Sequence, residues 1–136
     1  MNPGLVAEAQ LRLGQDRVTL HDGQSAWPFA DGSFDTCLLL FVLHHIADSV
    51  QTTLREAARV AKRVLVLEDQ PRTAKSRDLL QLAVQVTAQH FRPFGQDPQV
   101  YMQNIRPDSV WQKLFEEAGL HCVKQVEIPG TLQHPV

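Results

Sequence analysis

Apolar residues recur at helical spacing in several segments of the chain. The first runs from Pro3 to Leu13 and ends at Gly14, and Ser49 to Ala61 repeats the pattern with charged residues off the apolar stripe. A helix is also expected from Ser76 to Gln89. Arg106 to Ser109 reads as the cap of a last helix through Ala118, whose predicted core stripe and C-cap are Val110, Trp111, Leu114, Phe115 and Gly119.

Two short, unalternating apolar runs lie between these helical segments. They span Phe34 to Leu40 and Arg63 to Glu68. Runs of this kind are typical of parallel strands that are covered on both faces. Weaker strand patterns occupy Arg17 to His21, before the Asp22-Gly23 turn, and His121 to Ile128.

Alternating strands and helices predict an α/β fold, a three-layer α/β/α sandwich around a mostly parallel sheet. The 136 residues suffice for one domain spanning 1–136. In such sheets ligands bind beyond the carboxyl ends of the strands. The segments expected there are Asp22 to Ser25, Leu40 to His45 and Glu68 to Arg72.

The net charge of −2 gives no field that would favour nucleic acid or anionic lipid. A small-molecule substrate is therefore expected. The longest apolar run, Cys37 to Leu43, is too short to span a membrane, and no signal-peptide pattern is present, so we expect a cytoplasmic location. Cys37 and Cys122 lie in separate apolar segments and are expected to be buried thiols rather than metal ligands.

Three consecutive segments resemble the ubiquinone-biosynthesis type of class I, Rossmann-like S-adenosylmethionine-dependent methyltransferase. They are His21 to Gln24, Trp27 to Asp35, which matches the family pattern LPFxDxSFD, and Phe41 to Asp48, which matches the family's VLHH. Arg55 to Val60 and Trp111 to Leu120 resemble later family segments. The resemblance implies a Rossmann-like sheet, S-adenosylmethionine as cofactor and methyl transfer to a small-molecule acceptor.

The same resemblance assigns cofactor-binding roles. Asp22 would accept a hydrogen bond from the adenine amino group, with the backbone of Gly23 and Gln24 at the ring edge. Leu40 and Phe41 would form an apolar wall beside the methionine part. The structural alternatives are an Asp-Gly turn without a ligand and ordinary core packing.

Candidate catalytic residues follow the two apolar strands. His44 and His45 could include a general base, because the pKa of histidine lies near operating pH, or one of them could pack against or cap a helix. Glu68 and Asp69 end the second strand, and Asp69 is the carboxylate selected to orient or deprotonate a substrate. The alternative for both is to cap the loop or pair with Arg72. Adjacent histidines without partners do not favour a metal site.

The stretch 76–105 combines a helix with an aromatic-rich loop at the place where the family inserts a substrate lid. This stretch is predicted to be a lid-like insertion or, alternatively, a packing flap.

The family's glycine-rich loop and its first two strands would precede Asn2, and the printed sequence contains no Gly-x-Gly. The expected arrangement is therefore a partial methyltransferase domain, completed by a second copy or another chain, or repacked. The alternative to an enzyme is a non-catalytic methyltransferase-like remnant or interaction module. A nicotinamide-type oxidoreductase is less favoured, because it lacks both its phosphate loop and any matching motif.

Overall fold

The computed structural model describes residues 3–21, 25–46, 49–68, 75, 78–79, 81–83, 85–86 and 105–128. The named helices and strands follow the order α1 (Pro3–Leu13), β1 (Cys37–Leu40), α2 (Val50–Val60), β2 (Val64–Leu67) and α5 (Asp108–Glu117). Two short 3₁₀ helices, η1 (Gln15–Arg17) and η2 (Leu43–His45), follow α1 and β1. The described residues between 75 and 86 are also helical.

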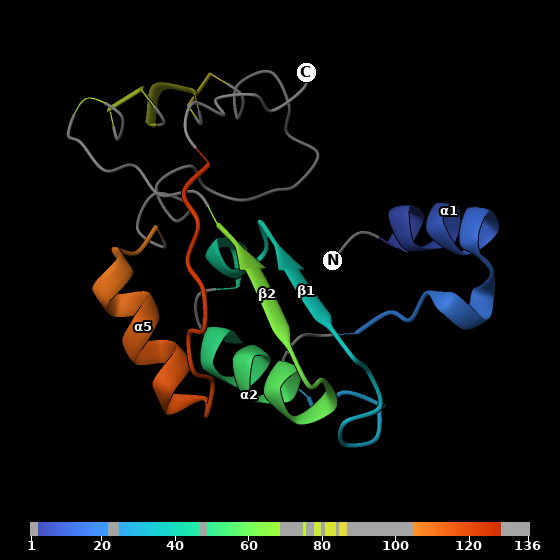
Figure 1. The fold of residues 1–136 in the computed structure, drawn as a ribbon. Helices are drawn as coiled ribbons and strands as arrows, with labels where there is room; N and C mark the ends of the chain where they lie inside the picture. The colour runs from blue at the N-terminus through green and yellow to red at the C-terminus, as the bar shows by residue number, and fades with distance from the viewer. Residues whose placement is uncertain are drawn as a thin grey trace.

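Strands β1 and β2 form a two-stranded parallel sheet, and α2 connects them (Figure 1). The register pairs Cys37 with Val64 and Leu40 with Leu67, so the two strands end at the same level. An isolated parallel bridge between Phe34 and Ala61 continues the pairing before the strands. The mixed helix and strand content and the parallel sheet confirm the predicted α/β class.

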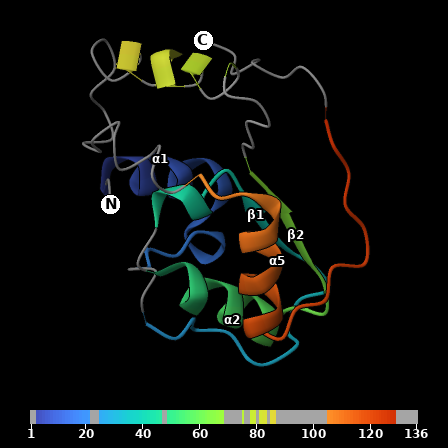
Figure 2. The ribbon, with the colours of Figure 1, turned by 90° about the vertical axis from the view of Figure 1, so that its left-hand side faces the viewer.

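One face of the sheet carries the core. Leu39 packs in a cluster with α2, η2 and α5, and the half-buried Cys37, Val64 and Val66 lie against the same cluster. Figure 2 shows α5 and α2 together on this side of the strands. The buried members of the cluster are Leu39, Leu43, Val50, Leu54, Ala57, Trp111 and Ala118.

The opposite face of the sheet is exposed, which contradicts the prediction that both strands are covered on both faces. The side chains of Leu38 and Leu65 are 56% and 54% exposed, and the register places them opposite each other. The cause is that α2 and α5 pack on the Leu39 face, while α1 stands apart from both strands (Figure 1). Among the described elements the sheet has one helical layer, and a third layer remains a prediction.

Two predicted strands do not form. Residues 18–21 and 121–128 are not assigned to a strand, and Arg17 belongs to η1. Val18 has extended backbone angles, but extended residues become a strand only when a neighbouring strand supplies hydrogen bonds. Val123 and Val126 are exposed, so the alternating pattern of 121–128 is not used for packing here.

The last helix confirms the predicted C-cap but not a side-chain cap at its start, where the N-cap residue is Pro107 and no side chain of the Arg106 to Ser109 segment makes a capping hydrogen bond. Gly119 has a φ of 79°, its N–H donates to Glu116 O, and the N–H of Leu120 donates to Phe115 O. These two bonds define a Schellman C-cap. Trp111 is buried as predicted, whereas Val110 is exposed, because it lies at the edge of the stripe.

The two cysteines differ in exposure. Cys37 is half-buried, and burial raises the pKa of its thiol, but Cys122 is exposed, contrary to the prediction, because it lies in the unpaired 121–128 segment. None of the described helices has the length and apolar character required to cross a membrane.

Candidate functional site

The carboxyl end of the sheet turns sharply at Phe41. The N–H of Phe41 donates to Leu67 O at 2.8 Å, which extends the strand pairing by one residue. Phe41 then adopts a φ of 52°, in the left-handed region that bulky residues rarely occupy. Backbone strain of this kind costs about 1–3 kcal/mol and is concentrated at functional sites.

This turn directs two successive backbone N–H groups at one carboxylate. The N–H groups of Val42 and Leu43 donate to Oε1 of Glu68 at 3.0 and 2.8 Å. Because backbone N–H groups can only donate, Oε1 acts as an acceptor for both bonds. Glu68, the residue that directly follows β2, is therefore bonded to the loop that follows β1.

The second oxygen of Glu68 contacts an imidazole. Oε2 lies 2.6 Å from Nδ1 of His44, and the two side chains are 6% and 3% exposed. Nε2 of His44 lies 2.8 Å from Nε2 of His45, and the ring centroids are 4.0 Å apart. His45 is exposed. The Glu68–His44–His45 triad thus connects a buried carboxylate to the surface through two rings.

The structure brings together four of the predicted site residues. His44 and His45 lie in η2, and Leu40 and Phe41 are exposed at the same edge of the sheet. Asp22, Gly23, Gln24 and Asp69 lie outside the described residues, so their roles stay predictions.

Glu68 is the residue that was not selected from the sequence. In the sequence it stands beside Asp69, and Asp69 is the carboxylate predicted to orient or deprotonate a substrate. No signal in the sequence separates the two carboxylates, because the register of β1 and β2 decides which of them faces the turn after β1. The alternative that one histidine packs at the helix start is also confirmed, because His44 is buried.

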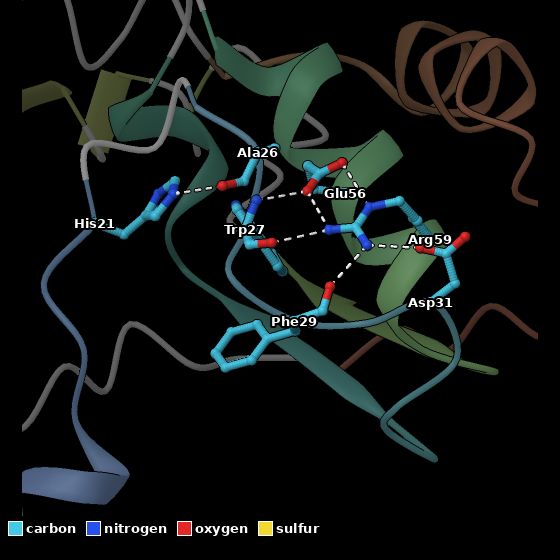
Figure 3. Close-up of polar contacts among 7 residues, drawn as sticks. All are labelled: His21, Ala26, Trp27, Phe29, Asp31, Glu56 and Arg59. Carbon is cyan, nitrogen blue, oxygen red and sulfur yellow. Dashed lines mark hydrogen bonds and ion pairs between the residues drawn. The ribbon is translucent and has the colours of Figure 1, made fainter.

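A second polar cluster holds the loop between the predicted adenine-contact segment and β1 (Figure 3). The guanidinium of Arg59, on α2, donates to the backbone oxygens of Trp27 and Phe29 at 3.0 and 2.8 Å. It also forms an ion pair with Asp31 at 2.7 Å. Nearby, Nε2 of His21 and the carbonyl oxygen of Ala26 lie 3.3 Å apart, across residues 22–24.

Glu56 completes this cluster. Its carboxylate accepts two hydrogen bonds from Arg59 and one from the Trp27 N–H at 2.6 Å. The hydrogen bonds from Arg59 lower the pKa of Glu56 to about 2, and those to Glu56 raise the pKa of Arg59. The cluster fixes residues 27–31 against α2 and so restrains one end of the predicted cofactor segment.

A metal centre finds no support in the part of the chain that the structure describes. No group of three or more His, Cys, Asp or Glu residues there is arranged to hold a metal ion.

Comparison with known families agrees with this arrangement. The model of a family described as "Methyltransferase domain" matches residues 1–64, from the N-terminus through β1 and α2 to the first residue of β2. Residues 1–64 are thus similar to a methyltransferase domain, and the small parallel sheet is consistent with a partial Rossmann-like fold. No curated protein and no solved structure gave a significant match.

Proposed function

We propose that this protein transfers a methyl group from S-adenosylmethionine to a small-molecule acceptor at the carboxyl end of the β1–β2 sheet. The observation that carries the proposal is the methyltransferase-domain match over residues 1–64, which includes β1, η2 and α2 around the triad. Ligands of parallel α/β sheets bind at this edge. The net charge of −2 is compatible with a small acceptor and gives no attraction to nucleic acid.

The described residues at the edge fit the apolar parts of the cofactor. Leu40 and Phe41 are 47% and 38% exposed although both are large and apolar, and they follow each other at the end of β1. They would form the wall beside the methionine part. Asp22 would accept from the adenine amino group, with Gly23 and Gln24 at the ring edge. The bound cofactor supplies an electrophilic methyl group on a sulfonium.

The protein's own contribution is alignment and proton removal. Methyl transfer from a sulfonium depends mainly on holding the nucleophile in line with the methyl group. His45, exposed and bonded to His44, is placed to take a proton from the acceptor. Asp69 remains a second candidate for orienting the acceptor.

Isothermal titration with S-adenosylmethionine and with its demethylated product tests cofactor binding. We expect Asp22→Ala to weaken binding by about tenfold, because one hydrogen bond to the ligand is lost. Asp16→Ala in η1 is the matched control and should leave binding unchanged. Absence of binding to the folded protein would refute the proposed activity.

A second candidate function is favoured by the exposed sheet face. Leu38 and Leu65 leave apolar surface beside the open edges of a two-stranded sheet, and such edges pair readily with other chains. The alternative is an interaction module that another chain, or a second copy, completes. Sedimentation that shows a stable, folded monomer binding the cofactor would exclude it.

A further inference from the structure

We propose that Arg59 and Glu56 are positioning residues for the methyl donor. They hold the backbone of Trp27 and so set the place of the predicted adenine-contact segment, residues 22–24. This inference rests on the proposed methyl transfer and adds two residues of α2 to the determinants of its cofactor affinity. It is carried by the hydrogen bonds to both backbone groups of Trp27, at 2.6 Å from its N–H to Glu56 and 3.0 Å from Arg59 to its carbonyl oxygen.

Trp27 is held at three points. Its N–H donates to Oε2 of Glu56, and its carbonyl oxygen accepts from Nη2 of Arg59. Its half-buried side chain packs against the hydrophobic core. The N–H and the carbonyl oxygen of one residue belong to the two peptide planes on either side of it. Both planes at Trp27 therefore have a fixed orientation relative to α2.

The anchored residue lies close in sequence to the segment 22–24, which is itself outside the described residues. Only Ser25 and Ala26 separate Trp27 from this segment. Consecutive Cα atoms are about 3.8 Å apart, so the near end of the segment is three such steps from a fixed residue. At its other end, Nε2 of His21 lies 3.3 Å from the carbonyl oxygen of Ala26 (Figure 3). Displacement of Trp27 would therefore displace both ends of the segment.

Arg59 acts through the loop, because its guanidinium has no donor left for a ligand. A guanidinium has five N–H donors, and hydrogen bonds to the protein use all of them. Their acceptors are the two carboxylate oxygens of Glu56, the carbonyl oxygens of Trp27 and Phe29, and Oδ1 of Asp31. A lysine at this position keeps the charge but cannot reproduce this planar set of bonds.

Hydrogen exchange measured by mass spectrometry tests the anchoring without a cofactor. In Arg59→Lys we expect faster exchange in a peptide that covers residues 21–29, because this part of the loop loses bonds to α2. A peptide over β1 should exchange at the wild-type rate. Unchanged exchange over residues 21–29, or an equal increase in both peptides, would overturn the proposal.

A double-mutant cycle tests whether the anchoring serves the ligand. The measurement is isothermal titration with S-adenosylhomocysteine, the demethylated product of the cofactor. Arg59→Lys should weaken binding about tenfold. In the Asp22→Ala background, where the adenine contact is already lost, the same change should weaken binding less than about twofold. General destabilisation would act equally in both backgrounds, so additive losses would exclude a positioning role.

The ion pair between Lys62 and Asp35 provides the matched control. It joins the residues after α2 to a later part of the same loop at 2.8 Å, but it connects two exposed side chains. Lys62→Ala should leave the affinity for S-adenosylhomocysteine and the exchange over residues 21–29 unchanged. Weaker binding in this variant, equal to that of Arg59→Lys, would contradict the specific role of Arg59.

A milder variant keeps the test decisive if Arg59→Lys does not fold. Asp31→Ala removes one acceptor of Arg59 at a side chain that is 80% exposed. Binding of S-adenosylhomocysteine should weaken about threefold, and this loss should disappear in the Asp22→Ala background. Wild-type affinity in Asp31→Ala, or the same threefold loss in both backgrounds, would count against the proposal.

Failure of the proposed function gives a different result. If the folded wild-type protein binds neither S-adenosylmethionine nor its product, methyl transfer is refuted and the positioning role with it. If the wild type binds the cofactor and Arg59→Lys binds it equally well, methyl transfer stands and the positioning role alone is refuted.

Discussion

Arg59 and Glu56 form a two-pronged ion pair within α2, with Nη2 of Arg59 2.7 Å from Oε2 of Glu56 and Nε 2.9 Å from Oε1. The remaining donors of the same guanidinium reach the loop before β1, at the carbonyl oxygens of Trp27 and Phe29. One planar side chain therefore joins the helix to the segment that leads from the predicted adenine contact to the sheet.

Arg59→Lys should lower the midpoint of thermal unfolding by several degrees. A lysine keeps the charge, but its single ammonium cannot reach both carboxylate oxygens and two carbonyl oxygens at once. Circular dichroism measures the change. Arg12→Lys, at the exposed pair with Glu8, is the control and should have little effect. Equal midpoints for the two variants would contradict the clamp.

Glu56 should make stability depend on pH in the acid range. Its pKa is lowered from 4.5 to about 2, so the folded state holds its proton less tightly than the unfolded state. Its contribution to the free energy of unfolding is fully present above the unfolded pKa and is lost as the pH falls through the folded pKa. Urea unfolding measured from about pH 6 down to about pH 2 should show this loss. Glu56→Gln should be less stable at neutral pH and should lose less on acidification.

Glu68→Ala should lower the free energy of unfolding by about 3 kcal/mol, because two backbone N–H groups and a buried imidazole lose their acceptor. Urea denaturation of the purified protein measures it. Glu117→Ala, at an exposed helical pair with Lys113, should cost less than about 0.5 kcal/mol. A small effect at position 68 would mean that solvent replaces the carboxylate, and Glu68 and His44 would not form a buried pair.

Phe41→Gly should separate stability from cofactor binding. Glycine adopts a φ of 52° without strain, so the free energy of unfolding should stay level or rise by up to about 1 kcal/mol. Binding of S-adenosylmethionine should weaken, because part of the apolar wall is removed. Phe29→Gly is the control, because Phe29 is as exposed as Phe41 but is not among the described residues with positive φ. The Phe29→Gly protein should be less stable than the wild type. A destabilised Phe41→Gly protein with normal binding would reverse both expectations.

Alanine substitutions at Leu38 and Leu39 test which face of the sheet is packed. Leu39 is 5% exposed, so Leu39→Ala should cost about 3 kcal/mol, whereas Leu38→Ala should cost under about 1 kcal/mol. Chemical denaturation of both variants at the same protein concentration gives the comparison. A large, concentration-dependent cost at Leu38 would instead favour the interaction module, with that face buried between chains.

Local patterns were sufficient for much of the fold. The periodicity of Ser49 to Ala61 placed α2 within one residue at each end, and Gly119 marked the end of α5. The apolar runs predicted β1 and β2, because a short run of consecutive apolar residues is typical of a buried strand. Residues 18–21 and 121–128 have strand-like patterns but form no strand. Whether such a pattern becomes a strand depends on partners distant in sequence, so the local pattern could not decide it.

The candidate site was only partly predictable for a similar reason. His44 and His45 were found from their motif, but their unequal burial follows from η2, which turns one ring inward and leaves the other outside. The prediction of Asp69 instead of Glu68 rests on local sequence alone, which does not contain the register of the two strands. Which acidic side chain faces the Val42 and Leu43 N–H groups depends on how β1 and β2 align, and neither sequence segment contains that information alone.

The register of β1 and β2 also determines whether a misaligned form of the sheet would be stable. A slip of one residue would bring Leu67 to the position of Glu68. Two backbone N–H groups and an imidazole would then lie against an apolar side chain that cannot accept a hydrogen bond. A misaligned sheet would therefore lose stability and the contact between Glu68 and His44 through the same atoms. Chains that reach the correct alignment are the stable ones, so misaligned chains are not expected to persist as folded protein.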